Sequence, residues 1–151
     1  MTKIDSINKK ILNTIQTNFP IHPRPYKIIG EQLGFSEDEI IGRIKSLKED
    51  MLIRRIGGNF SPDKLGYVST LCTAQVPENK IDHFIETVNA YPGVTHNYKR
   101  EHLFNVWFTF IAPSVETIKN NLKKITEATG VHPILNLPAT KLFKISANFK
   151  L

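Results

Sequence analysis

The chain has 151 residues, a length that suits one domain of ordinary size or two small ones. Hydrophobic residues make up 40% of it, enough for a packed core, so intrinsic disorder is not expected. The net charge of +6 admits a nucleic acid as partner, but residues 1–57 and 58–151 each hold ten Lys or Arg against seven Asp or Glu. Neither half is a basic arm, and the charge is equally compatible with a small polycarboxylate.

The compartment is indicated by what the sequence lacks. The first ten residues, MTKIDSINKK, have no apolar core of the kind that a signal peptide needs, and no stretch is long enough to span a membrane. The single cysteine, Cys72, permits no internal disulfide and lies in an apolar run, which predicts a buried thiol. We therefore expect a cytoplasmic protein without a membrane segment.

The first third of the chain predicts three short helices. Prolines at positions 20, 23 and 25 separate the first two, Gly34 ends the second, and Ser36 with Glu39 forms a capping box at the start of the third. A tight turn between the second and third helices is typical of a helix-turn-helix, and a short strand should follow. The predicted elements are helices at 5–16, 26–33 and from 36 onward, and a strand at 51–56, in a domain of residues 1–57.

The rest of the chain predicts the order strand, helix, strand, strand, helix, strand. That order is the ferredoxin-like βαββαβ arrangement, so the fold class is α+β, with a second domain of residues 58–151. The predicted elements are strands at 67–76, at 94–110 as a hairpin, and at 134–137 and 142–145, with helices at 80–90 and 114–129.

The hairpin carries unusual side chains for a strand pair. Alternation places Val94, His96, Tyr98 and Arg100 on one face and Lys99 on the other, with His102 at the turn. The returning strand adds Asn105, Trp107 and Thr109 on one face and Val106, Phe108 and Phe110 on the other. A half-polar, half-aromatic wall of this kind favours a flat anionic ligand over a plain core.

A helix-turn-helix followed by a ferredoxin-like domain resembles the Lrp/AsnC family of transcription regulators. The resemblance implies DNA binding through the third helix, amino-acid sensing by the second domain, and assembly through the sheet. The third helix, however, begins with Glu37, Asp38 and Glu39, three carboxylates that DNA phosphates would repel. The first turn therefore argues against DNA binding, and the helix-turn-helix is predicted to serve as a scaffold.

Several motifs sharpen this resemblance, the longest being GVTHNY at 93–98 with Arg100, His102 and NVWFT at 105–109. Together with Phe19-Pro20, RPY at 24–26 and RRIG at 54–57, they look like the sirohaem decarboxylases, Lrp/AsnC-like proteins of haem and haem d1 biosynthesis. That family implies a carboxy-lyase that removes carbon dioxide from the C12 and C18 acetates of sirohaem and gives didecarboxysirohaem. It also implies a heterodimer with a paralogous subunit and no added cofactor, since the iron belongs to the substrate.

The resemblance gives the polar residues candidate roles. Sirohaem carries eight carboxylates, so cations and ring contacts should bind it, and a histidine can exchange a proton near neutral pH. The candidate catalytic residues are His96, His102 and Arg100. The candidate substrate-binding residues are Arg24, Arg54, Arg55, Tyr98, Lys99, Trp107 and Lys141, with Phe104 as a further ring contact. No spacing of His, Cys, Asp or Glu indicates a metal site in the protein itself.

Alternatives stay open for each role. His96 is also compatible with a structural histidine, and His102 with an exposed turn residue or an axial ligand to the substrate iron. Tyr98 and Trp107 also suit a core, and the arginines also suit a solvated surface or a helix end. For the whole protein, the alternatives are a DNA-binding regulator of the Lrp/AsnC type and a tetrapyrrole sensor without catalytic activity.

Overall fold

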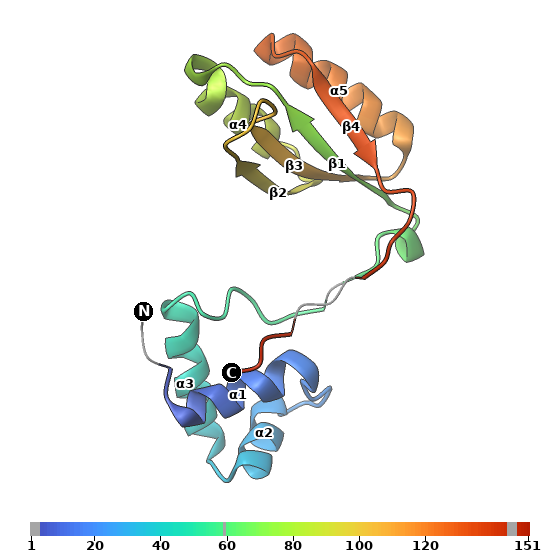
Figure 1. Ribbon diagram of the computed structural model, residues 1–151. Helices are drawn as coiled ribbons and strands as arrows, with labels where there is room; N and C mark the ends of the chain where they lie inside the picture. Colours follow the sequence, from blue (N-terminus) through green and yellow to red (C-terminus); the bar gives the residue numbers. More distant parts are fainter. Residues whose placement is uncertain (1–3, 59, 145–147) are drawn as a thin grey trace. The chain divides into compact units, whose positions relative to one another are not determined.

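The computed structural model describes residues 4–58, 60–144 and 148–151. The chain divides into two compact units, Met1–Gly58 with Lys144–Leu151, and Asn59–Phe143 (Figure 1). The boundary after residue 57 stays a prediction. The structure does group residues 144–151 with the first unit, although the sequence analysis assigned them to the second. The reason is local: the Gln16 side chain donates to the backbone oxygen of Phe149 at 2.7 Å and accepts from its N–H at 3.0 Å.

The first unit contains three helices, α1 (Ser6–Thr17), α2 (Pro25–Leu33) and α3 (Glu37–Glu49). Asp5 and Ser36 cap α1 and α3 by accepting from Asn8 N–H and Glu39 N–H. The turn between α2 and α3 is tight, since a Cβ on Gly30 would lie 2.5 Å from the Phe35 carbonyl oxygen. The predicted helix-turn-helix is confirmed. Its core consists of Ile11, Ile29, Ile40, Ile44, Leu47 and Ile53.

The strand predicted at 51–56 is wrong. Met51 has a positive φ of 58°, and the N–H groups of Leu52 and Ile53 both donate to the Leu47 carbonyl. Residues 51–53 therefore form the turn that caps the C-terminus of α3. Ile53 packs in the core of the three helices, and this apolar residue produced the false prediction of a strand. The last predicted strand is also absent from residues 142–144, which are irregular, whereas Ile145 lies outside the described residues.

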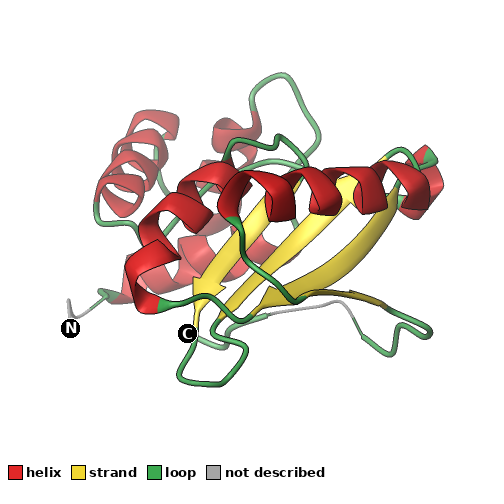
Figure 2. Cartoon of the chain, turned by 90° about the horizontal axis from the view of Figure 1, so that it is seen from above, coloured by secondary structure: helices red, strands yellow, loops and turns green. Residues whose placement is uncertain are grey.

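The second unit has the predicted order of elements. The strands are β1 (Val68–Ala74), β2 (Val94–Lys99), β3 (Val106–Ala112) and β4 (Ile134–Pro138), and the helices are α4 (Ile81–Asn89) and α5 (Val115–Thr129). Short 3-10 turns lie at Asp63–Leu65 and Glu78–Lys80. The strands form one twisted antiparallel layer in the order β2-β3-β1-β4 (Figures 1 and 2). The ferredoxin-like fold is confirmed.

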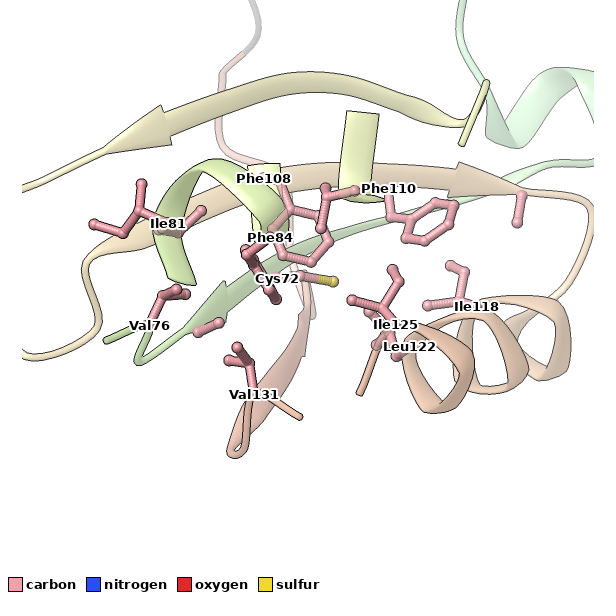
Figure 3. Close-up of a cluster of buried hydrophobic side chains, with 14 residues drawn as sticks. Cys72, Val76, Ile81, Phe84, Phe108, Phe110, Ile118, Leu122, Ile125 and Val131 are labelled. Atoms are coloured by element: carbon pink, nitrogen blue, oxygen red, sulfur yellow. The ribbon is translucent and has the colours of Figure 1, made fainter. Parts of the chain in front are cut away.

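The core of this unit lies on one face of the sheet. Cys72, Phe108 and Phe110 pack there with Phe84 of α4 and Ile125 of α5 (Figure 3). The opposite face carries large side chains that are at least one third exposed, namely Leu71, Tyr98, Leu135 and Leu137. The sheet therefore has one covered face and one open face.

Among the described residues, no helix combines the length and the apolar character that crossing a bilayer requires.

Candidate functional site

A β-bulge decides which side chains of β2 reach the open face. Val94 pairs with Phe110 and His96 pairs with Thr109, so β2 contains one extra residue between these pairs. As a result Val94 faces the core, and the prediction that it shares a face with His96 is wrong. Simple alternation from Val94 missed the bulge, but the predicted common face of His96 and Tyr98 is unaffected, because both follow it.

The open face brings four of the predicted residues together. The rings of His96 and Tyr98 are stacked, with centroids 6.2 Å apart and an interplanar angle of 24°. Tyr98 lies opposite Trp107 in the strand pair, and the guanidinium carbon of Arg100 lies 5.3 Å from the centroid of the Trp107 ring. We call His96, Tyr98, Arg100 and Trp107 the hairpin wall. It offers an imidazole, a phenol, an indole and a cation on one side of the sheet.

The turn that follows Arg100 fixes the orientation of His102. The His102 Nδ1 accepts from the N–H of Phe104 at 3.1 Å, and the Phe104 carbonyl accepts from the indole N–H of Trp107 at 2.7 Å. A ring nitrogen that accepts has no proton, so neutral His102 must have its proton on Nε2. His102 can therefore present an Nε2–H donor to a ligand.

His96 is less constrained. Its Nδ1 lies 3.1 Å from the hydroxyl oxygen of Thr95, and a hydroxyl can either donate or accept. Both tautomers of His96 are thus compatible with this contact. The two histidines differ in kind: His96 can exchange a proton at Nε2 in either direction, whereas neutral His102 is held as a donor.

Two of the predicted cations of this unit are not in the hairpin wall. Lys99 lies opposite Val106, on the covered side of the sheet, and its amine pairs with Glu78 at 2.7 Å. The predicted separation of Lys99 from Arg100 is thus confirmed. Lys141 follows β4 and lies over the Phe143 ring at 5.3 Å.

The other three predicted cations belong to the helical unit. Arg24 forms an ion pair with Glu37, at the first turn of α3. Its hydrogen bond lowers the pKa of the Glu37 carboxyl, and the same bond raises the pKa of Arg24. Arg54 and Arg55 have exposed side chains in the segment after α3. The structure thus gives Arg24 a partner that the sequence analysis did not foresee.

Cys72 is buried as predicted, and burial raises the pKa of its thiol to about 12. A thiol that stays protonated is a poor nucleophile, which fits a packing role. Within the described ranges, no three His, Cys, Asp or Glu side chains gather in a way that would hold a metal ion.

Sequence reasoning assigned no role to Asn105, at the base of the turn. Its side-chain amide bonds both the N–H and the carbonyl of Val76. It also lines a depression of about 520 Å³ beside the turn, together with Gln75, Val76, Pro77, Leu103, Gly130, Val131 and His132. The signals in the sequence were its place in the NVWFT motif and a polar residue at the start of an apolar strand, and neither reveals its partner.

A helix-turn-helix unit joined to a βαββαβ unit with an open sheet face defines a protein of the Lrp/AsnC-like class. The family model for an "AsnC-like ligand binding domain" matches residues 64–144, and that for a "Siroheme decarboxylase NirDL-like HTH domain" matches residues 8–54. The chain is 54% identical over 151 residues to the "Siroheme decarboxylase alpha subunit" of Desulfovibrio desulfuricans, covering 100% of this chain and 87% of the relative. The chain belongs to the sirohaem decarboxylase family.

Two further relatives place it within that family. It is 31% identical over 146 residues to the "Siroheme decarboxylase NirG subunit" of Stutzerimonas stutzeri, covering 97% of this chain and 99% of the relative. The crystal structure of the siroheme decarboxylase NirDL in complex with an iron-uroporphyrin III analogue superposes with a TM-score of 0.66 and 32% identity. That match covers 87% of this chain and 43% of the NirDL chain, so this chain spans less than half of NirDL.

Proposed function

We propose that this chain is one subunit of a sirohaem decarboxylase, which removes carbon dioxide from the C12 and C18 acetates of sirohaem and leaves two methyl groups. The observation that carries the proposal is the hairpin wall, set in a chain that matches a named alpha subunit over its full length at 54% identity. The much lower identity to a NirG subunit, 31%, supports the alpha-type assignment.

The wall suits the substrate's shape and charge. Sirohaem is a flat macrocycle with eight carboxylates, so it needs an aromatic surface for its face and cations for its rim. Trp107 and Tyr98 supply the surface, and Arg100, held beside Trp107, presents a planar fork that matches a carboxylate. The NirDL complex with an iron-uroporphyrin analogue supports a ligand of this chemical class.

The reaction itself needs one proton for each acetate. The bond between the acetate methylene and its carboxylate carbon breaks, carbon dioxide leaves, and the electron pair stays on the exocyclic carbon and the macrocycle. A proton then completes the methyl group. We assign this proton to His96, whose contact with Thr95 permits either direction of transfer.

We assign His102 a different role, that of a hydrogen-bond donor to the substrate through Nε2. Ligation of the substrate iron through Nε2 would require the proton to move to Nδ1, which would displace the hydrogen bond from Phe104 N–H. The structure of the turn therefore favours a donor over an axial ligand.

The remaining assignments are also proposals. Arg24, Arg54, Arg55, Lys99 and Lys141 stay candidate contacts to substrate carboxylates, although Arg24 and Lys99 would first have to release Glu37 and Glu78. The enzyme works without an added cofactor, together with a paralogous subunit, and in the cytoplasm, where a lone buried thiol such as Cys72 stays reduced.

The test is anaerobic incubation of sirohaem with this chain, alone and with its co-expressed paralogue, followed by mass spectrometry. Loss of about 88 mass units, two carbon dioxide molecules, is expected in the presence of both subunits. Tight binding without any mass change would instead make the protein a tetrapyrrole sensor. Absence of both binding and turnover would overturn the proposal.

A further inference from the structure

The side chain of Asn105 takes the place of a backbone hydrogen-bonded pair at the end of the sheet, beside the hairpin turn. Backbone pairing between β1 and β3 ends at Ala74 opposite Val106. Asn105 is the residue just before β3. Its Nδ2 donates to the Val76 carbonyl and its Oδ1 accepts from the Val76 N–H, both at 2.8 Å. A single side chain thus joins β3 to the segment after β1 as donor and acceptor at once.

The same residue closes the turn that carries part of the proposed site. The backbone carbonyl of Asn105 accepts from the N–H of Arg100 at 2.7 Å, so it fixes the residue whose guanidinium lies over Trp107. The N–H of His102 in turn donates to the Arg100 carbonyl at 3.0 Å. Through its backbone Asn105 closes the turn, and through its side chain it anchors the turn to the edge of β1.

We propose that Asn105 is a positioning residue for substrate binding: it holds the turn at residues 100–104 so that Arg100 stays over Trp107. The inference rests on the proposed function, because its consequence is a properly placed carboxylate clamp. Asn105 itself need not touch the substrate. It acts through Arg100.

The chemistry of the bond pair explains why an asparagine is needed. Aspartate can still accept from the Val76 N–H but cannot donate to the Val76 carbonyl, and alanine can do neither. Leaving a partly buried backbone group without its hydrogen-bond partner costs more free energy than the loss of a surface contact does. The Lys99–Glu78 ion pair near this corner is solvent-exposed and should contribute little to holding the turn, and the buried hydrogen bond from the Thr73 hydroxyl to the Val106 carbonyl is left intact by a change at Asn105.

Trp107 provides a test that does not need substrate. It is the only tryptophan in the chain, and both its indole N–H and its ring face contact the turn. Asn105→Ala should shift its fluorescence emission to longer wavelength and increase its quenching by acrylamide. The matched control is Asn136→Ala, which removes a hydrogen bond to Thr70 of β1 from the other side of the sheet and should leave Trp107 unchanged.

A double-mutant cycle tests whether Asn105 acts through Arg100. The full chain with its co-expressed paralogue is titrated with iron uroporphyrin III, and binding is followed by the absorbance of the macrocycle. Asn105→Ala should weaken binding by about threefold to tenfold. Combined with Arg100→Ala, it should weaken binding no further than Arg100→Ala alone. If Asn105 has a merely structural role, the two substitutions act independently, and the fold-losses in affinity of the single variants multiply in the double variant.

The outcomes separate this inference from the proposed function. If the unmodified protein binds iron uroporphyrin but Asn105→Ala leaves Trp107 unchanged, or if the two substitutions multiply, the positioning role is wrong and the function stands. If the unmodified protein neither binds nor turns over, the function falls. Should Asn105→Ala fail to fold, Asn105→Asp, which keeps the acceptor, is used instead and should show the same Trp107 shift to a smaller extent.

Discussion

Two arginines of the helical unit, Arg24 and Arg43, and the single arginine of the sheet unit, Arg100, have opposite surroundings. In the helical unit, Arg24 pairs with Glu37, and Arg43 pairs with Asp5 at 3.0 Å and Glu39 at 3.3 Å. In the sheet unit, Arg100 lies over an indole ring, and among the described residues no carboxylate pairs with it. Arg24 and Arg43 are thus neutralised by acids of their own unit, whereas Arg100 lies on the open face of the sheet.

This difference indicates where the chemistry of the protein lies. A recognition helix needs basic or amide side chains near its N-terminus to approach DNA. The first turn of α3 has three carboxylates instead, and the basic group one turn later, Arg43, is engaged by two acids. We therefore propose that the helix-turn-helix serves as a scaffold and that the ligand binds at the sheet.

The largest effect should come from the sheet's proposed proton donor. His96→Ala should lower turnover of sirohaem by roughly 10²–10⁴-fold, because a positioned acid contributes about that much, while binding of the macrocycle changes little. The measurement is single-turnover kinetics followed by mass spectrometry, with binding titrated separately. The matched control is His83→Ala, an exposed histidine on α4. Normal turnover by His96→Ala would remove His96 from the mechanism.

A smaller effect is expected from the open-face cation. Arg100→Ala should weaken binding of iron uroporphyrin by about 10- to 100-fold, the range for a charge-assisted hydrogen bond. Arg100→Lys should recover only part of this, since lysine keeps the charge but lacks the planar fork. Arg43→Ala in the helical unit is the comparison, and its affinity should equal that of the unmodified protein. If the two alanine variants bind equally well, the contrast between the units has no functional meaning.

The fold was predictable because local signals and global topology agree. The cap at Ser36 and the glycine stop at Gly34 act where the sequence indicates. The failed strand at 51–56 shows the limit. Its apolar residue, Ile53, is buried by helices, and an apolar pattern alone does not say which neighbour provides the burial.

The site was predictable only as far as alternation holds. The common face of His96 and Tyr98 followed from the period of a strand, but the pairing that places Trp107 beside them did not. The bulge beside Thr95 did not, because an extra residue leaves no mark in the pattern of side chains. The pairing of Arg24 with Glu37 was likewise hidden, since it joins residues from two elements whose packing is a tertiary property.

A DNA-binding measurement tests whether the helical unit is only a scaffold. With its acidic first turn, α3 should support at most weak, non-specific binding, with dissociation constants of about 10⁻⁴–10⁻⁶ M and a steep dependence on salt. Fluorescence anisotropy with random duplexes measures the affinity, and repeated selection from the same pool measures sequence preference. Enrichment of one sequence would show that the helical unit still reads DNA, contrary to a scaffold role.

The smallest effect should be the pH dependence that the internal ion pair gives the helical unit. Arg24 holds the pKa of Glu37 below its ordinary value of 4.5, so the unfolded chain takes up a proton at Glu37 at a higher pH than the folded chain does. The contribution of the pair to stability is therefore fully present above that ordinary value and is lost as the pH falls through the lowered pKa. Thermal unfolding of the full chain, compared with Glu37→Gln from about pH 7 to about pH 3, should show a difference that shrinks with acid.

Glu49→Gln, at the far end of α3, is the control for this measurement, and its difference from the unmodified protein should stay small at every pH. The Arg24 side chain is 62% exposed and the Glu37 side chain 20%, so solvent screening reaches the pair and keeps the effect modest, and added salt should reduce it further. A Glu37→Gln difference that does not depend on pH would mean that Arg24 does not hold the carboxylate. Arg24 would then be as available to an anionic ligand as Arg100, and the contrast between these two arginines would be lost.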